Sequence, residues 1–278
     1  MIKKIRIGKI SYINASPVYY GLDHGLLPEW IEMVPDVPST LNRQIMAGDI
    51  QISPISAAFY AMNHNDLLLL PDLSISCHGP VMSVILASNY PLEALNNRNV
   101  IFSPESASAA SFLQMIFRQK NITPLYRVHP VHDCKVVAQK ADAALVIGDS
   151  ALTQPWHEQF TYCVDLGQLW YDMTQLPFVF AVWVVRKNFA QEHPDKAAGI
   201  HRLLLESKTR GYRNIDKVVE SGCSRLKLGR DIISRYFKHL YCDLDNEKLN
   251  AMKLFFDSLY EQGVLSEKAH IRFFDPKI

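Results

Sequence analysis

The sequence predicts an α/β fold with two lobes and a helical C-terminal layer. Three observations lead to this prediction. Short apolar strand patterns alternate with short helical patterns up to residue 88, and the same alternation restarts at residue 91. From residue 188 to 263, apolar residues instead recur at i, i+3 and i+4, which is typical of amphipathic helices. A β-α-β-α order favours a mainly parallel sheet with helices packed against it.

The elements of the first lobe follow from apolar spacing and from residues that start and stop helices. We expect strands over 5–10, 30–34, 50–55, 67–70 and 81–87, helices beginning at 16 and over 41–46 and 57–62, and a polar turn over 74–80. Ser39 is expected to be the N-cap of the second helix, because its hydroxyl can accept a hydrogen bond from a free N–H of the first turn. Gly48 is expected to stop that helix, since glycine tolerates the left-handed conformation that follows a helix end.

The second lobe repeats the pattern. Strands are expected over 100–102, 125–128, 143–147 and 178–185, and helices over 107–118 and 134–139. Because 81–87 and 178–185 flank this lobe, we expect them to connect the two lobes. The predicted domains are therefore residues 1–86 plus 184–278 for the first lobe and 87–183 for the second. A ligand cleft is expected between them, near the carboxyl ends of the strands.

Charge and hydropathy exclude several classes of protein. The 278 residues carry 29 basic and 28 acidic side chains, so a net charge of +1 gives no electrostatic argument for nucleic acid. The balance hides a net charge of −4 over residues 1–185 and +5 over 186–278, which is typical of solvated helical faces. The longest uninterrupted apolar stretch, 178–185, has eight residues, well below the ~18 of a membrane-spanning helix. We therefore expect neither a nucleic-acid nor a membrane partner.

Cysteines and the first residues predict the compartment. The five cysteines are scattered and form no C-x-x-C pair, so they predict neither a disulfide scaffold nor a zinc knuckle. The start MIKKIRIGKI is charged but leads into no apolar signal-peptide core. These features predict a soluble, cytoplasmic protein whose oligomeric state is left open.

Short loops rich in hydroxyl groups follow several expected strands. They are Ser11–Asn14, Ser53–Ser56, Ser76–Pro80, Ser103–Ser108 and Gly148–Ser150. Several precede helix N-termini, where free N–H groups and the helix dipole favour an anion. A serine before a helix is usually only a cap, and the acids Glu105 and Asp149 are expected mainly to stabilise helix dipoles. Together the loops predict a site for a small carboxylate or phosphate compound, held by neutral donors. Nucleotide-binding and hydrolase motifs such as G-x-G-x-x-G and G-x-S-x-G are absent from the sequence.

Six blocks, in order along the first two-thirds of the chain, carry a family resemblance. They are RIGKISYINASPVYYGL at 6–22, VPSTLNRQIMAGDIQISPISAAFYA at 37–61, LLLLPDLSISCHGPVMSVILAS at 67–88, SPESASAASFL at 103–113, ALVIGDSAL at 144–152 and LPFVFAVW at 176–183. In this order they resemble the chorismate dehydratase family of the futalosine route to menaquinone. The resemblance implies a two-lobed, periplasmic-binding-protein-like (type II) α/β fold adapted to catalysis without a metal or organic cofactor. It implies a hydro-lyase that converts chorismate, its small-molecule partner, to 3-[(1-carboxyvinyl)oxy]benzoate (3-enolpyruvylbenzoate) and water.

The same resemblance assigns roles to residues. The family's active-site Asn falls on Asn14, and the Ser that closes its G-P-V-x-S block falls on Ser83. The positions expected to bind substrate are Ser11, Tyr12, Ser56, Ser106, Ala107, Ser108, Gly148 and Asp149. The chain departs from the family's T-G-L-P block at Gln175, where the family has glycine, and from its N-T-L-P block after Asn14.

The implied dehydration removes the C3 proton and the C4 hydroxyl, and aromatisation of the ring drives it. We expect Asn14 to orient the enolpyruvyl side chain and Ser83 to hydrogen-bond near the reacting ring positions. Expulsion of hydroxide needs a proton donor or strong hydrogen bonding at the leaving oxygen. Because the loops contain few free bases, the substrate's enolpyruvyl carboxylate could itself accept the C3 proton.

Three alternatives remain open at this point. A non-catalytic protein of the same fold could bind a small carboxylate, although a signal peptide would have favoured that function. The related 1,4-dihydroxy-6-naphthoate synthase has an N-terminal pattern resembling S-P-C-P-N-D, whereas this chain has Ser11-Tyr12-Ile13-Asn14. A ligand-sensing module could dock a partner through the basic C-terminal third, but no contiguous basic run supports it.

Overall fold

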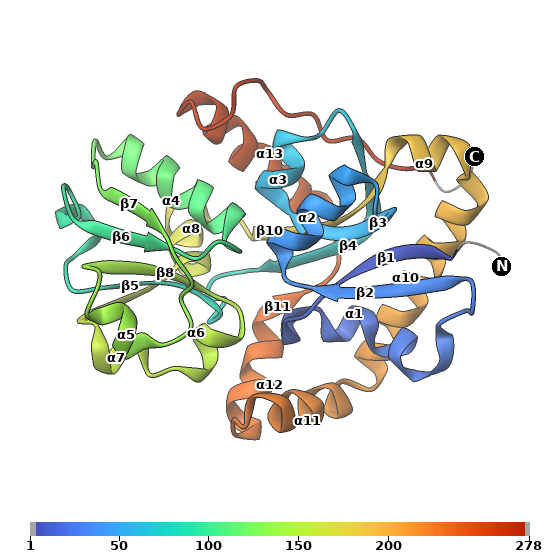
Figure 1. The fold of residues 1–278 in the computed structure, drawn as a ribbon, viewed down its shortest axis with the longest axis horizontal. Coiled ribbons are helices and arrows are strands. Elements are labelled where there is room, and N and C mark those ends of the chain that lie inside the picture. Colours follow the sequence, from blue (N-terminus) through green and yellow to red (C-terminus); the bar gives the residue numbers. More distant parts are fainter. Residues whose placement is uncertain (1–3, 276–278) are drawn as a thin grey trace.

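The structure, a computed structural model, describes residues 4–275 and is built on two β-sheets that lie side by side (Figure 1). The larger sheet has the order β11-β4-β10-β3-β1-β2, and the smaller has the order β7-β6-β8-β5-β9. The strands of the larger sheet are β1 (Ile5–Ile10), β2 (Ile31–Asp36), β3 (Ile52–Ser56), β4 (Leu67–Cys77), β10 (Phe178–Arg186) and β11 (Leu240–Tyr241). Those of the smaller sheet are β5 (Val84–Ser88), β6 (Asn99–Phe102), β7 (Leu125–Val128), β8 (Ala143–Ile147) and β9 (Tyr162–Asp165).

Both sheets are mixed, so the prediction of a mainly parallel sheet is wrong. In the larger sheet, β1 runs parallel to β2 and β3, but β10 pairs antiparallel with β3 and β4. In the smaller sheet, β6 is parallel to β7 and β8, while β5 is antiparallel to β8 and β9. The chain passes into the second lobe before β5 and returns as β10, which inserts between strands made more than a hundred residues earlier.

Helices surround each sheet. In the first lobe they are α1 (Ser16–Gly21), α2 (Pro38–Ala47) and α3 (Ala57–Met62), with a short 3-10 helix, η1 (Ile13–Ala15), after β1. In the second lobe they are α4 (Ala107–Gln119), α5 (Cys134–Ala138), α6 (Asp149–Thr153), α7 (Trp156–Gln159) and α8 (Leu166–Thr174). The C-terminal layer contains α9 (Lys187–Glu192), α10 (Pro194–Arg213), α11 (Ile215–Leu226), α12 (Arg230–His239) and α13 (Asn246–Glu261). The prediction of a helical C-terminal layer is therefore confirmed.

Several local predictions differ from the structure. The expected polar turn over 74–80 is wrong up to Cys77, because Ser74 and Ser76 continue β4 as buried strand residues. Ser39 is not an N-cap, since α2 begins at Pro38, a residue suited to the first helical position. Gly48 does end α2, with φ 83°.

The lobe boundaries predicted at 86/87 and 183/184 each fall inside a strand. Strand pairing places all of β5 in the smaller sheet and all of β10 in the larger one. The segments that pass between the sheets are therefore 78–83 and the turn that follows α8. The division of the chain into lobes otherwise stays a prediction.

The main apolar core extends through both lobes. Four aromatic rings, Phe112, Trp170, Phe178 and Phe255, join α4, α8, β10 and α13, with ring centroids 4.9–6.3 Å apart. Such pairs add ~0.5–1.5 kcal/mol each beyond the area they bury. A separate smaller cluster lies on the other face of the smaller sheet, under α5 and α7. The lobes are therefore packed together by apolar side chains along part of their boundary.

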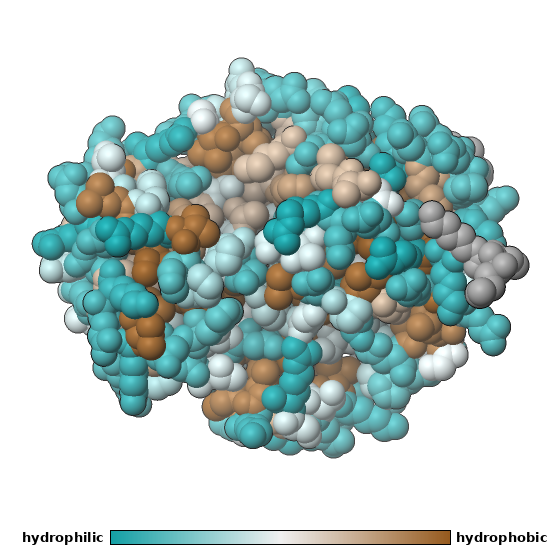
Figure 2. Space-filling model, in the orientation of Figure 1, coloured by the Kyte–Doolittle hydropathy of each residue, from teal (hydrophilic) through white to brown (hydrophobic). Residues whose placement is uncertain are grey.

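The visible surface is mainly hydrophilic. Figure 2 shows hydrophobic residues scattered between hydrophilic ones on this face. Within residues 4–275, no helix combines the length and the apolar character needed to cross a membrane.

Candidate active site

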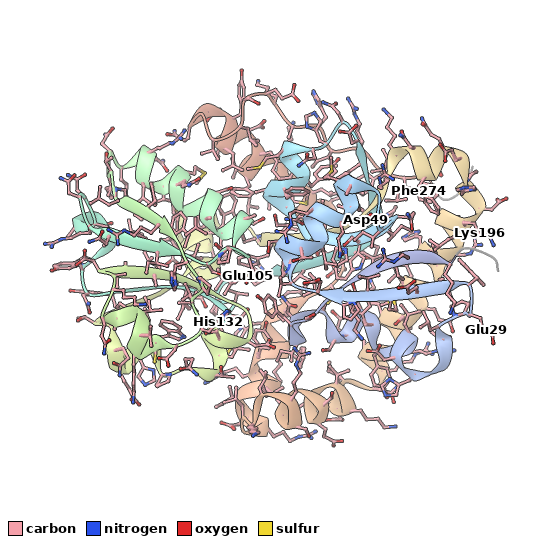
Figure 3. All side chains as sticks on the ribbon, in the orientation of Figure 1. Glu29, Asp49, Glu105, His132, Lys196 and Phe274 are labelled. Carbon is pink, nitrogen blue, oxygen red and sulfur yellow. The ribbon has the colours of Figure 1, made fainter. Side chains whose placement is uncertain are left out.

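A cavity lies between the two sheets, where the loops after β1, β3, β6 and β8 meet. It holds about 600 Å³ of space, its open mouth included. Figure 3 shows Glu105, one of its lining residues, at the boundary between the lobes. Its polar lining residues are Tyr12, Asn14, Ser56, Ser83, Glu105, Ser106 and Ser108. The remaining lining residues are Ile10, Pro38, Ile75, Val81, Val84, Ala107, Ala109, Ile147, Gly148, Phe180 and Ala181.

The structure brings most of the predicted site residues together. Both predicted catalytic residues line the cavity, as do six of the eight predicted substrate-binding residues: Tyr12, Ser56, Ser106, Ala107, Ser108 and Gly148. Ser11 and Asp149 are not among the lining residues and lie beside the cavity. Their contact with substrate stays a prediction.

Asn14 presents an unsatisfied polar group. It belongs to η1, which follows β1 directly, and its side-chain Oδ1 is buried without a hydrogen-bond partner within the described residues. A buried amide end without a partner is destabilising by about 1–3 kcal/mol. Oδ1 is an acceptor and the side chain lines the cavity, so a hydroxyl of a bound ligand can donate the missing hydrogen bond.

Ser83 is held by a tight turn in the segment that enters the second lobe. Met82 has φ 63°, and the Ser83 N–H donates to the Val81 carbonyl at 2.8 Å. The Asp165 carboxylate accepts hydrogen bonds from the N–H groups of Val81, at 3.0 Å, and Met82, at 2.6 Å. The same carboxylate caps α8 through Gly167 N–H at 2.9 Å. Asp165 therefore fixes the turn that presents Ser83 to the cavity.

The hydroxyl of Ser83 has a hydrogen-bond partner in the C-terminal helical layer. Tyr236, on α12 of the C-terminal layer, donates a hydrogen bond from Oη to Ser83 Oγ at 3.0 Å. Tyr236 is buried, and burial raises the pKa of its phenol, so it stays protonated at neutral pH.

The N-terminus of α4 forms one wall of the cavity. Ala107, Ser108 and Ala109 are its first residues, and such positions have N–H groups without an intrahelical acceptor. Together with the helix dipole, they favour a carboxylate at this wall. The Ser108 hydroxyl itself is engaged elsewhere: it accepts from Ala58 N–H at 2.9 Å and donates to the Phe180 carbonyl at 3.1 Å.

The other serines of the site combine capping with lining. Ser56 caps α3 by accepting from Phe59 N–H at 3.2 Å. Ser106 donates to the Ser103 carbonyl at 2.6 Å, and the Ser103 hydroxyl donates to the Glu105 carboxylate. The capping role expected for a serine before a helix is therefore observed at Ser56.

Gly148 is required for the contact between the lobes at Tyr12. Its φ of 67° and ψ of −145° lie in a region that residues with a Cβ avoid. A Cβ at this position would also meet the Tyr12 ring at 3.0 Å. Burial raises the pKa of Tyr12, and the charges of Glu105 and Asp149 raise it further, so the phenol is a neutral donor.

Asp149 bridges the two lobes beside the cavity. Its carboxylate accepts from Ile13 N–H at 3.2 Å and from the Arg225 guanidinium at 3.1 Å. Arg225, on α11, also donates to the Ser11 carbonyl. Burial raises the pKa of Asp149, while these two partners oppose the rise.

Tyr236, Arg225 and Asp165 were not predicted from the sequence. A buried tyrosine on the apolar side of a helix usually has a hydrogen-bond partner, so Tyr236 gave a weak signal. Nothing in the sequence separates Arg225 from other surface arginines, or Asp165 from other helix caps. Within residues 4–275, no group of three His, Cys, Asp or Glu side chains is arranged to hold a metal ion.

Two sheets with a cavity between them at the strand ends define a periplasmic-binding-protein-like fold. The structure is similar to the alkanesulfonate-binding protein SsuA from Xanthomonas axonopodis pv. citri bound to MOPS, with a TM-score of 0.67, 12% identity and coverage of 96% of this chain and 95% of that chain. A crystal structure of a protein from Archaeoglobus fulgidus gives a TM-score of 0.75 at 19% identity, covering 94% of this chain and 98% of that chain. The fold expected from the sequence blocks is therefore confirmed.

Sequence comparison places the chain in a family. A family model described as "Menaquinone biosynthesis" matches residues 5–261, and the chain belongs to this menaquinone biosynthesis family. The chorismate dehydratase of Thermus thermophilus is 27% identical to it over 268 residues, which cover 91% of this chain and 94% of that protein. The family resemblance of the six sequence blocks is thereby confirmed.

Proposed function

We propose that this protein is a chorismate dehydratase, a carbon–oxygen hydro-lyase that converts chorismate to 3-[(1-carboxyvinyl)oxy]benzoate and water. One observation carries the proposal most directly. Asn14, with its unsatisfied buried amide, and Ser83 line one cavity together with the N-terminus of α4. Membership of the menaquinone biosynthesis family and the Thermus thermophilus relative support the same activity.

The cavity suits a small dianion with an apolar ring. Chorismate carries two carboxylates, and the first turn of α4 offers N–H donors without placing a cation in the cavity. The ring can pack against apolar lining residues such as Ile75, Val84 and Phe180. A net charge near zero is compatible with this mode of binding, since helix ends and hydroxyls take the place of lysine and arginine.

The proposed chemistry assigns one task to each catalytic side chain. Asn14 donates a hydrogen bond from its Nδ2 to the enolpyruvyl group and orients it over the ring. Ser83 donates a hydrogen bond near C4, where the departing hydroxyl develops negative charge. The enolpyruvyl carboxylate of the substrate takes the C3 proton and passes it to the hydroxide that departs from C4, so that water leaves, and the gain of aromaticity drives the reaction. Glu105, which also lines the cavity, is the protein carboxylate that could compete for this proton.

The test is turnover of chorismate by the purified protein, followed by absorbance and mass of the aromatic product. Asn14→Ala and Ser83→Ala are expected to lower kcat about a hundredfold or more, because each removes a group that acts on the reacting atoms. Ser88→Ala is a matched control, since Ser88 is also buried but bonds to the Tyr90 carbonyl at 2.7 Å outside the cavity. Near-normal turnover in both cavity variants would contradict the assignment.

Two further outcomes separate the alternatives. Tight binding of chorismate by the wild-type protein without product would favour a non-catalytic carboxylate-binding protein. Turnover that survives Glu105→Gln supports the substrate carboxylate as the base, whereas a loss as large as that of Ser83→Ala assigns this task to Glu105.

A further inference from the structure

We propose that Tyr236 is a positioning residue for the reaction: its phenol orients the Ser83 hydroxyl so that the serine proton points into the cavity. The inference rests on the proposed function and extends it to the C-terminal helical layer. It assigns to α12 a part in catalysis, beyond covering the larger sheet.

The contact is made by two buried side chains from distant parts of the chain. Tyr236 Oη lies 3.0 Å from Ser83 Oγ, and the two residues are 1% and 3% exposed. The Tyr236 ring lies on the buried side of α12, 5.6 Å between centroids from Phe237, and Ile233 of the same helix is also fully buried. Only Ser83 of this pair lines the cavity, so Tyr236 acts through the serine.

The direction of the hydrogen bond follows from counting protons. A serine hydroxyl has one proton and two lone pairs, and a neutral phenol has one proton to donate. Within the described residues, the bond to Ser83 is the hydrogen bond recorded for the Tyr236 hydroxyl. If Ser83 donated to Tyr236, the phenol proton would remain unpaired in the core, which is costly. Ser83 therefore accepts from Tyr236, and its own proton is left for the cavity.

This arrangement bears on the transition state more than on substrate binding. A serine hydroxyl rotates freely unless a partner holds it, so fixing its proton toward the cavity removes reorganisation at the moment of reaction. Accepting a hydrogen bond also polarises the serine and strengthens the bond that it donates. Both effects grow as negative charge develops on the leaving oxygen of the substrate.

Tyr236→Phe tests the inference with the smallest available change, because it removes one hydroxyl and keeps the ring. We expect kcat for chorismate to fall about tenfold, the size of one hydrogen bond, while KM and the Kd for chorismate stay within twofold of wild type. Tyr60→Phe is the matched control. Tyr60 is also fully buried, but its hydroxyl bonds to the main chain of His270 and Arg272, and its kcat is expected to stay unchanged.

A double-mutant cycle separates positioning from a general effect on the fold. If Tyr236 acts through Ser83, adding Tyr236→Phe to Ser83→Ala causes no further loss of kcat. Equal losses in the two backgrounds would overturn the inference, as would an unchanged kcat in Tyr236→Phe alone. Folded protein is measured for each variant from its unfolding curve, so that kcat refers to native molecules. If the wild-type protein does not convert chorismate, both the proposed function and this inference are wrong. If the wild type is active and Tyr236→Phe has an unchanged kcat, this inference alone is wrong.

Discussion

Single residues with positive φ shape the cavity wall at two points. Gly148 brings the main chain against the Tyr12 ring, and Met82, with φ 63°, turns the chain immediately before Ser83. A left-handed residue with a side chain is destabilising by roughly 1–2 kcal/mol. At Met82 the three-residue turn is held by the Asp165 carboxylate, whose hydrogen bonds to two successive N–H groups offset this strain. The strain is therefore located beside a predicted catalytic residue.

Gln175 also has a left-handed backbone, but on an exposed helix end. It is the C-cap residue of α8 with φ 57°, at the position where the family that the sequence blocks resemble has glycine. We expect Gln175→Gly to raise the free energy of unfolding by about 0.5–1 kcal/mol, because the relieved strain exceeds the entropy that glycine adds to the unfolded chain. Denaturant unfolding curves measure the change.

Gln175→Ala is the control for this prediction. It keeps the strained backbone and removes only the exposed hydrogen bond from the Gln175 amide to the Tyr171 carbonyl. Its stability is expected to be equal to wild type or slightly lower. A glycine variant no more stable than the alanine variant would contradict the prediction.

At the scale of elements, the fold could be predicted where apolar residues recur regularly over a short span. The strands over 5–10 and 143–147 and the helix over 57–62 have the bounds that the sequence indicated. β4 could not be predicted in full, because its polar half is stabilised by remote partners. Ser74 donates to the Asp243 carbonyl and Ser76 to the Tyr241 carbonyl, more than 160 residues along the chain.

The residues of the candidate site also divide into those that the sequence predicts and those that it does not. Asn14 and the serine loops were predictable because they follow strands and match an ordered set of blocks, whereas Ser83 directly precedes β5 and was predictable from the blocks alone. Tyr236 and Arg225 were not, because each is one polar residue on an ordinary amphipathic helix and its role depends on which loop that helix covers. The region from α6 to α8 was missed as well, since α6, α7 and β9 are only four or five residues long and show no clear period.

The packing of α10 against β4 predicts a pH effect. His201 on α10 is 4% exposed, and its Nε2 bonds to the Pro71 carbonyl at 2.9 Å. Burial lowers the pKa of His201 below the ~6.5 of an unfolded chain. Below pH ~6.5 the unfolded chain therefore binds a proton more readily than the fold does, so the free energy of unfolding falls as pH falls.

The experiment compares urea unfolding of wild type and His201→Gln, which keeps a donor but does not titrate, at pH 7.5 and 5.5. Between these two pH values we expect the free energy of unfolding to fall more in the wild type than in the variant, because only the wild type carries the buried imidazole. His157→Gln, at an exposed position on α7, is expected to follow the wild type. A His201→Gln variant with the same pH slope as wild type would disprove the effect.

Across the whole molecule, the contacts between the lobes include an apolar connection and a polar one. The aromatic rings around Phe112 and Phe178 pack against α13, whereas the polar bridge of Asp149 reaches Ile13 and Arg225 on α11. Figure 1 shows α13 and α11 at opposite ends of the boundary between the lobes. Because the apolar contact is extensive and the polar bridge consists of a few hydrogen bonds, one of them exposed, we expect the lobes to separate first at the polar side, beside the cavity.

Arg225→Gln tests this expectation. The side chain is 49% exposed, so the ion pair with Asp149 contributes at most about 1 kcal/mol, and its loss is expected to raise KM for chorismate about two- to fivefold with little change in kcat. Small-angle X-ray scattering without ligand should show a larger radius of gyration. Arg230→Gln is the matched control, because Arg230 is 52% exposed and pairs with Asp216 and Glu220 inside the helical layer, without bridging the lobes. If both variants behave alike, the Asp149 bridge does not control the separation of the lobes.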